Sequence, residues 1–226
     1  MERLIRKGWW KILAIILLVY TLIAGFMVPV PHLPILHETI RNLYFHVPMW
    51  FGMIIILTFS VVYSIRYLGT SDLRDDIWAI EAANVGVLLG TLGIATGSLW
   101  SAVTWGEWWS NDPKQTGAAI ALLIYMAYFV LRNSVPDIEK RAKVAAVYNI
   151  FAFATLIPLL FILPSMTDSL HPGAGGNPGF NVYDLDNRMR MVFYPSVFAW
   201  TLLGLWIVSL MYRVRVLKFK ELEILD

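Results

Sequence analysis

The stretch Ala82–Val103, AANVGVLLGTLGIATGSLWSAV, contains no charged residue and runs directly into the tryptophan-rich segment Thr104–Lys114, TWGEWWSNDPK. A helix needs about 20 consecutive apolar residues to cross the hydrocarbon core of a bilayer. The stretch meets that length, so it predicts a membrane-spanning helix. Another apolar run, Gln115–Leu131, follows at once. The tryptophan-rich segment is therefore expected to join two spans at one membrane surface.

Similar apolar runs occupy most of the chain. Of its 226 residues 58% are hydrophobic, and the mean hydropathy is +0.62. Six spans of about 20 residues each leave no room for a soluble domain. The first run has no clear signal-peptide cleavage site, so we interpret it as a retained helix. The sequence predicts one all-α integral membrane domain over residues 1–226, with six transmembrane helices at about 10–30, 47–65, 82–103, 115–131, 144–167 and 191–212.

Lys and Arg residues are divided unequally between alternate loops. Of the 18, only four lie in the loops 31–45, 104–114 and 168–190, namely Arg41, Lys114, Arg188 and Arg190. By the positive-inside rule, both termini are cytoplasmic and these three loops face outward. The basic residues flank spans and form no patch that would suit a nucleic acid, so the expected surroundings are membrane lipid. The absence of cysteine excludes disulfides and thiolate metal sites.

All four histidines lie in or beside the loops predicted to face outward: His32, His37, His46 and His171. Pro48 is typical of the first turn of a helix, which places His46 at the outer mouth of the second span. His171 follows the fifth span and precedes the glycine-rich stretch 173–179, which is rich in turn signals. Neutral imidazole is a good iron ligand, so two histidines at one membrane surface could hold an iron between them.

A single histidine near a helix end is more often an ordinary interface residue than a ligand. His32 and His37 have no distinguishing context and are interpreted as structural. The ligand hypothesis for His46 and His171 depends on the tryptophan-rich segment, which lies on the same predicted side.

Trp105, Trp108 and Trp109 offer an aromatic surface for a large planar apolar ligand. Tryptophans also gather at membrane interfaces as belts, so the cluster alone does not decide between the two interpretations. If the segment is helical, Trp105 and Trp108 could share one face, because residues i and i+3 are neighbours on a helix.

The end of this segment predicts a helix start. Asp112 suits the N-cap, Pro113 the first helical position and Gln115 the third, which together form a capping box. Asp112 could therefore be only a cap. The positive end of the helix and Lys114 would favour anionic groups in the same loop.

Polar residues near the spans are few. Glu81 and Asn84 open the third span, Asn149 lies in the fifth, and no ionisable residue is expected deep in any span. Intramembrane ionisable residues usually mark ion or proton paths, so this pattern argues against an ion-coupled transporter.

Three segments in this order resemble the CcmC family of haem-handling proteins of cytochrome c maturation, whose larger relatives are CcmF and CcsA: YFHVP at 44–48, WGEWWSND at 105–112 and LHPG at 170–173. The resemblance covers about residues 41–194. It implies that His46 and His171 are the axial ligands of haem b iron. It also implies a haem-binding loop formed by Trp105, Gly106, Trp108, Trp109 and Asp112. The outward-facing cations, Arg41 and Lys114 among them, are candidates for propionate contacts or plain surface charge.

Two positions depart from the pattern. Asn111 stands where relatives often have tryptophan, and Lys114 stands where many small members have arginine; the Asp-Pro-Lys sequence looks more like CcsA. The resemblance implies a haem-binding protein of the bacterial cytoplasmic membrane and not an enzyme. It would present haem at the outer face to a CcmE-like periplasmic chaperone, alongside a CcmD-like small membrane protein and the CcmA–CcmB transporter. The chain lacks a Gly-Lys-Ser/Thr phosphate motif, so ATP hydrolysis would belong to a partner.

Two other functions stay open. A transporter subunit for a small hydrophobic solute, without haem, would need a polar path through the spans, for which the sequence offers only Asn84, Thr91, Thr96 and Asn149. A quinone-linked oxidoreductase subunit with internal haem would need histidines in mid-helix, and none of the four histidines lies there.

Overall fold

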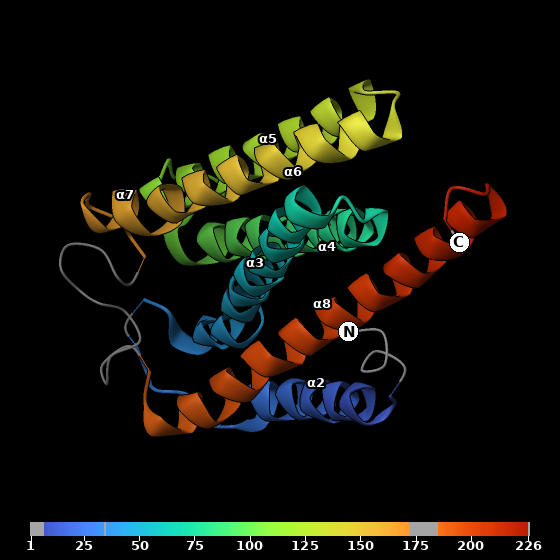
Figure 1. The fold of residues 1–226 in the computed structure, drawn as a ribbon. Coiled ribbons are helices and arrows are strands. Elements are labelled where there is room, and N and C mark those ends of the chain that lie inside the picture. The colour runs from blue at the N-terminus through green and yellow to red at the C-terminus, as the bar shows by residue number, and fades with distance from the viewer. Residues whose placement is uncertain (1–6, 34, 172–184, 226) are drawn as a thin grey trace.

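The computed structural model describes residues 7–33, 35–171 and 185–225. Within them six helical stretches are long and apolar enough to cross a membrane, which confirms the predicted number of spans (Figure 1). The elements are α2 (Trp9–Met27), η1 (His37–Tyr44) leading into α3 (His46–Thr70), α4 (Leu73–Trp105), α5 (Pro113–Ser134), α6 (Ile138–Ile157) continuing through the π-helical η2 (Pro158–Ile162) into α7 (Leu163–Ser165), and α8 (Asn187–Glu221).

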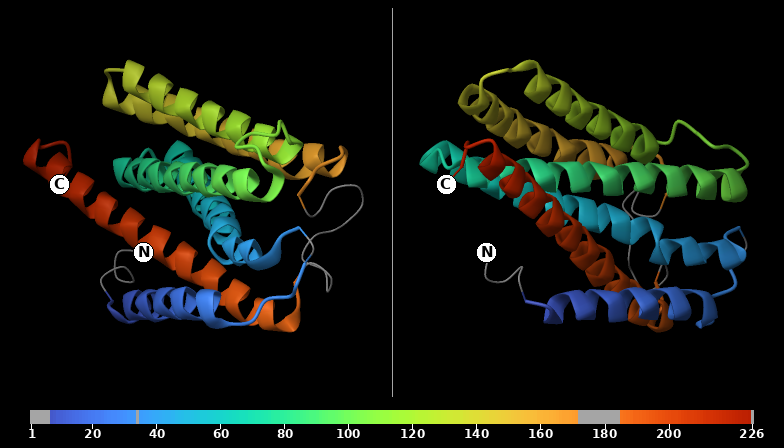
Figure 2. Two further views of the ribbon diagram at one scale, coloured as in Figure 1. Left: turned by 180° about the vertical axis from the view of Figure 1, so that it is seen from behind. Right: turned by 90° about the vertical axis from the view of Figure 1, so that its right-hand side faces the viewer.

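Helix α4 lies at the centre of the bundle. In its most apolar window 72% of the residues are buried, against 22–44% in the other spans. Helices α3 and α8 pack against it, α2 pairs with α8 on one flank, and α5 pairs with α6 on the other (Figure 2). The helices alternate in direction, so the tryptophan-rich segment, η1 and α7 gather at one end (Figure 1). We call this the histidine end, because His46 and His171 lie there.

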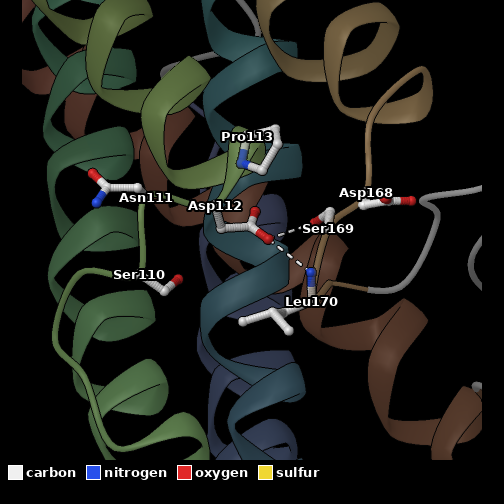
Figure 3. Close-up of a pocket in the computed structure, with 7 residues that line it drawn as sticks. All are labelled: Ser110, Asn111, Asp112, Pro113, Asp168, Ser169 and Leu170. Carbon is white, nitrogen blue, oxygen red and sulfur yellow. Dashed lines mark hydrogen bonds between the residues drawn. The ribbon is translucent and has the colours of Figure 1, made fainter.

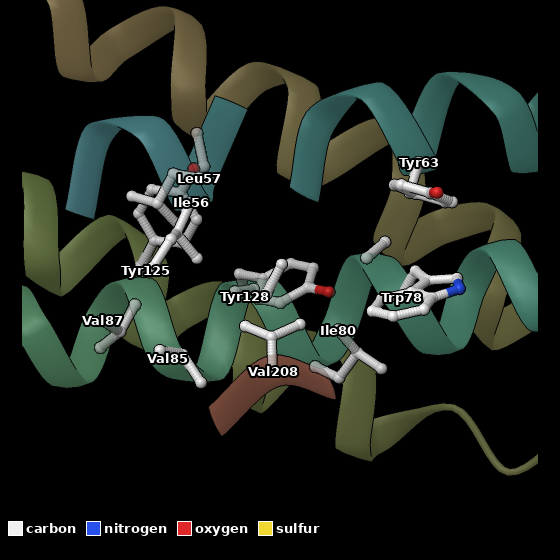
Figure 4. Packing of buried hydrophobic residues seen from close by; sticks show 14 of the residues in the cluster. Ile56, Leu57, Tyr63, Trp78, Ile80, Val85, Val87, Tyr125, Tyr128 and Val208 are labelled. Atoms are coloured by element: carbon white, nitrogen blue, oxygen red, sulfur yellow. The ribbon is translucent and has the colours of Figure 1, made fainter. Parts of the chain in front are cut away.

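Four glycines on α4 allow α3 to approach closely, and we call them the glycine seam: Gly86, Gly90, Gly93 and Gly97. A Cβ added at any of them would lie 2.5–2.7 Å from a side-chain atom of α3. The facing side chains are, in order, Leu57, Met53, Trp50 and His46. Small residues at a helix interface are the usual means of close packing in membranes. Figure 4 shows the surrounding apolar core, in which Ile56 and Leu57 are fully buried.

At the opposite end, which we call the basic end, the first turns of α4 are held by three ion pairs. Arg66 of α3 pairs with Asp75, Arg132 of α5 with Asp76, and Arg215 of α8 with Glu81. Helix α4 begins at Leu73, well before the predicted start at 82. These acids lie near the beginning of α4, so they agree with the expectation that no ionisable residue lies deep in a span. They are tolerated because each acid meets an arginine from another helix.

A hydroxyl joins α2 to α8. Pro195 lies inside α8 and has no N–H, so the carbonyl one turn earlier, at Met191, loses its helical donor. The Tyr20 hydroxyl of α2 donates to that carbonyl at 3.0 Å. An unsatisfied carbonyl is costly in lipid, where no water can replace the lost bond. This contact explains part of the pairing between α2 and α8.

Replacing Arg132 with alanine should lower the free energy of unfolding by about 3–5 kcal/mol, because it leaves the buried Asp76 carboxylate without its bidentate partner. The measurement is equilibrium unfolding in detergent. Arg66→Ala is the matched control: the Arg66 side chain is 56% exposed, so its loss should cost less than about 1 kcal/mol. Equal losses in the two variants would contradict this interpretation of the buried pair.

Candidate functional site

His46 is the first residue of α3, and Pro48 lies in the first turn as predicted. The imidazole is buried, with 8% exposure. Its ring centroid lies 6.3 Å from that of Trp50 and 6.0 Å from that of Trp100, both in edge-to-face geometry. Gly97 faces the imidazole from α4 and leaves no room beyond it, since an added Cβ would lie 2.6 Å from Cε1. The packing therefore fixes where the ring lies.

The hydrogen bonds of His46 determine which ring nitrogen is available. Its Nδ1 lies 3.1 Å from Oγ1 of Thr96. The Thr96 hydroxyl lies 2.8 Å from the Leu92 carbonyl and 3.2 Å from the Gly93 carbonyl, so with its hydrogen donated to the backbone of α4 its oxygen accepts from His46, which also hydrogen-bonds the Gly93 backbone. The hydrogen of a neutral imidazole therefore lies on Nδ1, and the lone pair of Nε2 stays available to a ligand.

His171 presents the same pattern from another part of the chain. It follows α7, and its Nδ1 lies 2.9 Å from Oδ1 of Asp112, at the start of α5. An ionised carboxylate can only accept, so Nδ1 carries the hydrogen, and in the neutral imidazole the lone pair is then on Nε2. Trp105, the last residue of α4, packs edge-to-face against the imidazole at 4.9 Å. His46 and His171 lie within electrostatic range of each other.

The Asp112 carboxylate links α5 to the His171 segment (Figure 3). It caps α5 by accepting from the Lys114 N–H at 2.9 Å, as predicted, and it also accepts from the Ser169 hydroxyl at 2.7 Å and the Leu170 N–H at 2.8 Å. Its side chain is fully buried beside an open pocket of about 300 Å³. The donors of His171, Ser169 and Leu170 occupy the other hydrogen-bonding positions of the carboxylate. Asp112 therefore orients these groups and is not exposed.

Two opposing effects act on the pKa of Asp112. Burial would raise it, but the hydrogen bonds from His171, Ser169 and Leu170 together outweigh burial and hold the pKa well below its usual range. The stability that this carboxylate contributes is therefore complete above about pH 4 and is lost only as the pH falls through the lowered pKa. At physiological pH Asp112 stays ionised.

The predicted capping box is wrong in its second half. The Gln115 side chain accepts from the N–H and hydroxyl of Ser110, at 3.0 and 3.1 Å, and not from the N–H of Asp112. The chain reverses at Asn111, whose φ of 56° lies in the left-handed region. Asparagine tolerates that region better than most residues do, which is a physical reason for Asn111 at this position.

The three tryptophans do not share a helical face, contrary to the expectation for Trp105 and Trp108. Helix α4 ends at Trp105, and Gly106 follows in the left-handed conformation with a φ of 83°. Trp105 contacts His171, whereas Trp108 and Trp109 are 64% and 38% exposed. A residue with a Cβ would be strained at that φ, so glycine suits the position at which the helix ends. The segment thus holds one tryptophan inward and leaves two accessible.

The remaining predicted residues have different surroundings. Arg41 donates to the carbonyls of Gly25 and Val28 at 3.0 and 2.7 Å and pairs with Glu38, so it ties η1 to the end of α2. Lys114 lies in the first turn of α5. The exposed side chains at this end include His32, His37 and Arg188, whereas Arg190 is partly buried. The glycine-rich stretch 173–179 lies outside the described residues.

The site offers imidazole nitrogens as possible metal ligands. Among the described residues no group of three or more histidines, aspartates and glutamates could hold a bare metal ion. Two neutral imidazoles, each with Nδ1 engaged, fit the two axial positions of a macrocycle-bound iron. No local sequence pattern links Thr96 to His46 or Ser169 to Asp112, because the two residues of each pair are far apart in the sequence.

Replacing Asp112 with alanine should destabilise the protein more than replacing Asp137, the N-cap of α6. Both variants lose a cap worth about 1 kcal/mol. Asp112→Ala should cost about 1–3 kcal/mol more, because it leaves Leu170 and His171 without their acceptor. Equilibrium unfolding in detergent measures the difference, and hydrogen exchange of a peptide containing Leu170 should accelerate in that variant alone. Equal effects would show that Asp112 acts only as a cap.

The chain was compared with known proteins. The family model "CcmC: Heme exporter protein C" matches residues 2–223. Heme exporter protein C of Bradyrhizobium diazoefficiens is 31% identical over 140 residues, 60% of this chain and 51% of that protein. The Paracoccus denitrificans counterpart is 26% identical over 153 residues, 68% and 63% of the two chains. Cytochrome c biogenesis protein CcsA of Pelargonium hortorum is 38% identical over 80 residues, 35% and 25% of the two.

These matches cover about half to three-fifths of the length of the two heme exporter relatives. The family model, by contrast, extends over nearly the whole chain. The similarity to CcsA agrees with the relation to CcsA that the sequence resemblance implies. With six apolar helices and the family match together, the chain is a multi-pass membrane protein that belongs to the heme exporter protein C (CcmC) family.

Proposed function

We propose that this protein binds haem b at the histidine end and delivers it for c-type cytochrome biogenesis. The observation that carries the proposal is the matched presentation of two histidines. Each is held through Nδ1 by an acceptor from another element, Thr96 within α4 and Asp112 at the start of α5, and each keeps Nε2 available. His46 and His171 would be the axial ligands of the iron. The printed names of the relatives, heme exporter protein C and cytochrome c biogenesis protein CcsA, support haem as the cargo.

The other groups at this end suit a porphyrin. Trp105 packs against His171, and the accessible Trp108 and Trp109 offer flat apolar surface to the ring. Lys114, close to the positive end of α5, is a candidate for a propionate contact. Arg41 is less suited, because its guanidinium already serves the end of α2. Iron supplies the coordination chemistry, and the protein supplies the binding surface and the orientation.

We further propose that the histidine end faces the outer side of a bacterial cytoplasmic membrane, since few Lys and Arg residues lie in its loops. The acceptor would be a CcmE-like periplasmic haem chaperone. A CcmD-like small membrane protein and the CcmA–CcmB transporter would be partners, and they would supply any ATP hydrolysis. The chain itself would form and break no covalent bond.

The structure gives little support to a transporter subunit for a small solute. The polar residues that the sequence offered for such a path make hydrogen bonds within the bundle: Asn149 donates to Ser60 and Ser64, and Thr91 donates to the Val87 carbonyl. Asn84 donates to Glu81. These groups satisfy hydrogen bonds within the bundle, which is a structural use.

Purified protein with added haem should show a low-spin bis-histidine absorption spectrum. The double variant His46→Ala/His171→Ala should lose it, because both axial ligands are gone. The double variant His32→Ala/His37→Ala is the matched control, since these histidines are exposed at the same end and should be dispensable. Unchanged haem content and spectrum in the first double variant would overturn the assignment of the ligands.

Gly97→Ala should perturb the iron site without removing a ligand. The added Cβ would lie 2.6 Å from Cε1 of His46, so the imidazole must shift. We expect a change in the low-spin spectrum, from weakened or lost His46 ligation, with the fold retained. Gly69→Ala is the control, because nothing lies within 4 Å of a Cβ added there. Identical spectra for the two variants would exclude His46 from the haem site.

A further inference from the structure

The two histidines differ in the acceptor that holds Nδ1. His171 donates to Asp112, an ionised and fully buried carboxylate, at 2.9 Å. His46 donates to the neutral hydroxyl of Thr96 at 3.1 Å. We infer that Asp112 and Thr96 are positioning residues that make the two axial ligands unequal, with His171 the stronger ligand. This inference rests on the proposed haem-binding function.

The charge of the acceptor changes how strongly each imidazole can bind iron. A hydrogen bond to a carboxylate is charge-assisted and roughly twice as strong as one between neutral groups. It draws the Nδ1 hydrogen away from the imidazole and raises the basicity of Nε2. A threonine oxygen has no net charge and gives a smaller effect. The bond from iron to His171 is therefore the stronger of the two.

Hydrogen bonds to Asp112 also hold His171 in place, although His171 lies outside a regular helix. The Ser169 hydroxyl and the Leu170 N–H both donate to Oδ2 of Asp112. The His171 N–H donates in turn to the Ser169 hydroxyl at 3.1 Å. The segment 169–171 is thus fastened to the first turn of α5 by the carboxylate that orients the imidazole. Thr96, in contrast, contributes one hydrogen bond to His46.

Asp112 can be altered without removing the helix cap. Asparagine is as good an N-cap as aspartate, so Asp112→Asn removes the charge and keeps Oδ1 as the acceptor for Lys114 and His171, whereas the amide nitrogen that replaces Oδ2 no longer accepts from Ser169 and Leu170. Thr96→Val removes the hydroxyl at nearly constant volume. Each has a matched control on the chain: Asp137→Asn at the N-cap of α6, and Thr91→Val on α4, whose hydroxyl donates to the Val87 carbonyl.

The test is the iron–histidine stretching frequency of ferrous haem, measured by resonance Raman spectroscopy in single-histidine variants. Haem held by His171 in His46→Ala should show a higher frequency than haem held by His46 in His171→Ala. Adding Asp112→Asn to His46→Ala should lower the frequency toward that of the other variant. Adding Thr96→Val to His171→Ala should change it much less, and the two control substitutions should change neither. Equal frequencies, or no response to Asp112→Asn, would overturn the inference.

A second measurement uses the protein with both histidines present. The charged acceptor stabilises ferric iron, so Asp112→Asn should raise the reduction potential of the bound haem and weaken haem affinity by about 10–100-fold. Thr96→Val should shift both by less. Larger or equal shifts for Thr96→Val would reverse the assignment. A wild-type protein that binds no haem would instead refute the proposed function, which is a different result from two equal ligands.

Discussion

The close approach of α3 and α4 is the constraint on which the rest of this structure depends. Hydrophobic driving force between helices is weak in lipid, so a membrane bundle must gain its stability from tight packing and from polar contacts between helices. The glycine seam provides the first of these. It admits four side chains of α3 in register, and the last of them is His46. The position of one proposed ligand is thus a direct result of how the two central helices pack.

The basic end complements the seam. Three arginines from α3, α5 and α8 bind three acids in the first turns of α4, so the central helix is held by three of its neighbours. Of the three pairs, Arg132–Asp76 is buried on both sides, so breaking it would leave Asp76 as a buried charge without its partner, whereas the Arg66 side chain is more than half exposed. In a similar way, the Tyr20 hydroxyl donates a hydrogen bond to the Met191 carbonyl, which has lost its helical donor. Each of these contacts joins two helices and limits their relative movement.

Asp112 combines two roles that are chemically compatible. A helix start favours a negative charge because its free N–H groups point outward. The same negative charge is what orients and strengthens a histidine ligand through Nδ1. One buried carboxylate therefore fixes the beginning of α5 and the orientation of His171 together. It is also the reason that a segment after α7, otherwise irregular, is held beside the last residue of α4.

The sequence by itself determined the six apolar helices, the N-cap at Asp112 with Pro113 in the first turn, and the resemblance that implies His46 and His171 as haem ligands. These are local properties: hydropathy, helix propensity and short motifs are all readable within a few residues. The true start of α4 was not readable, because Asp75, Asp76 and Glu81 look like a solvated loop until their arginine partners are known. Only the tertiary structure paired His46 with Thr96 and His171 with Asp112, residues 50 and 59 positions apart. Such contacts depend on the register of packed helices, which no local pattern in a single sequence specifies.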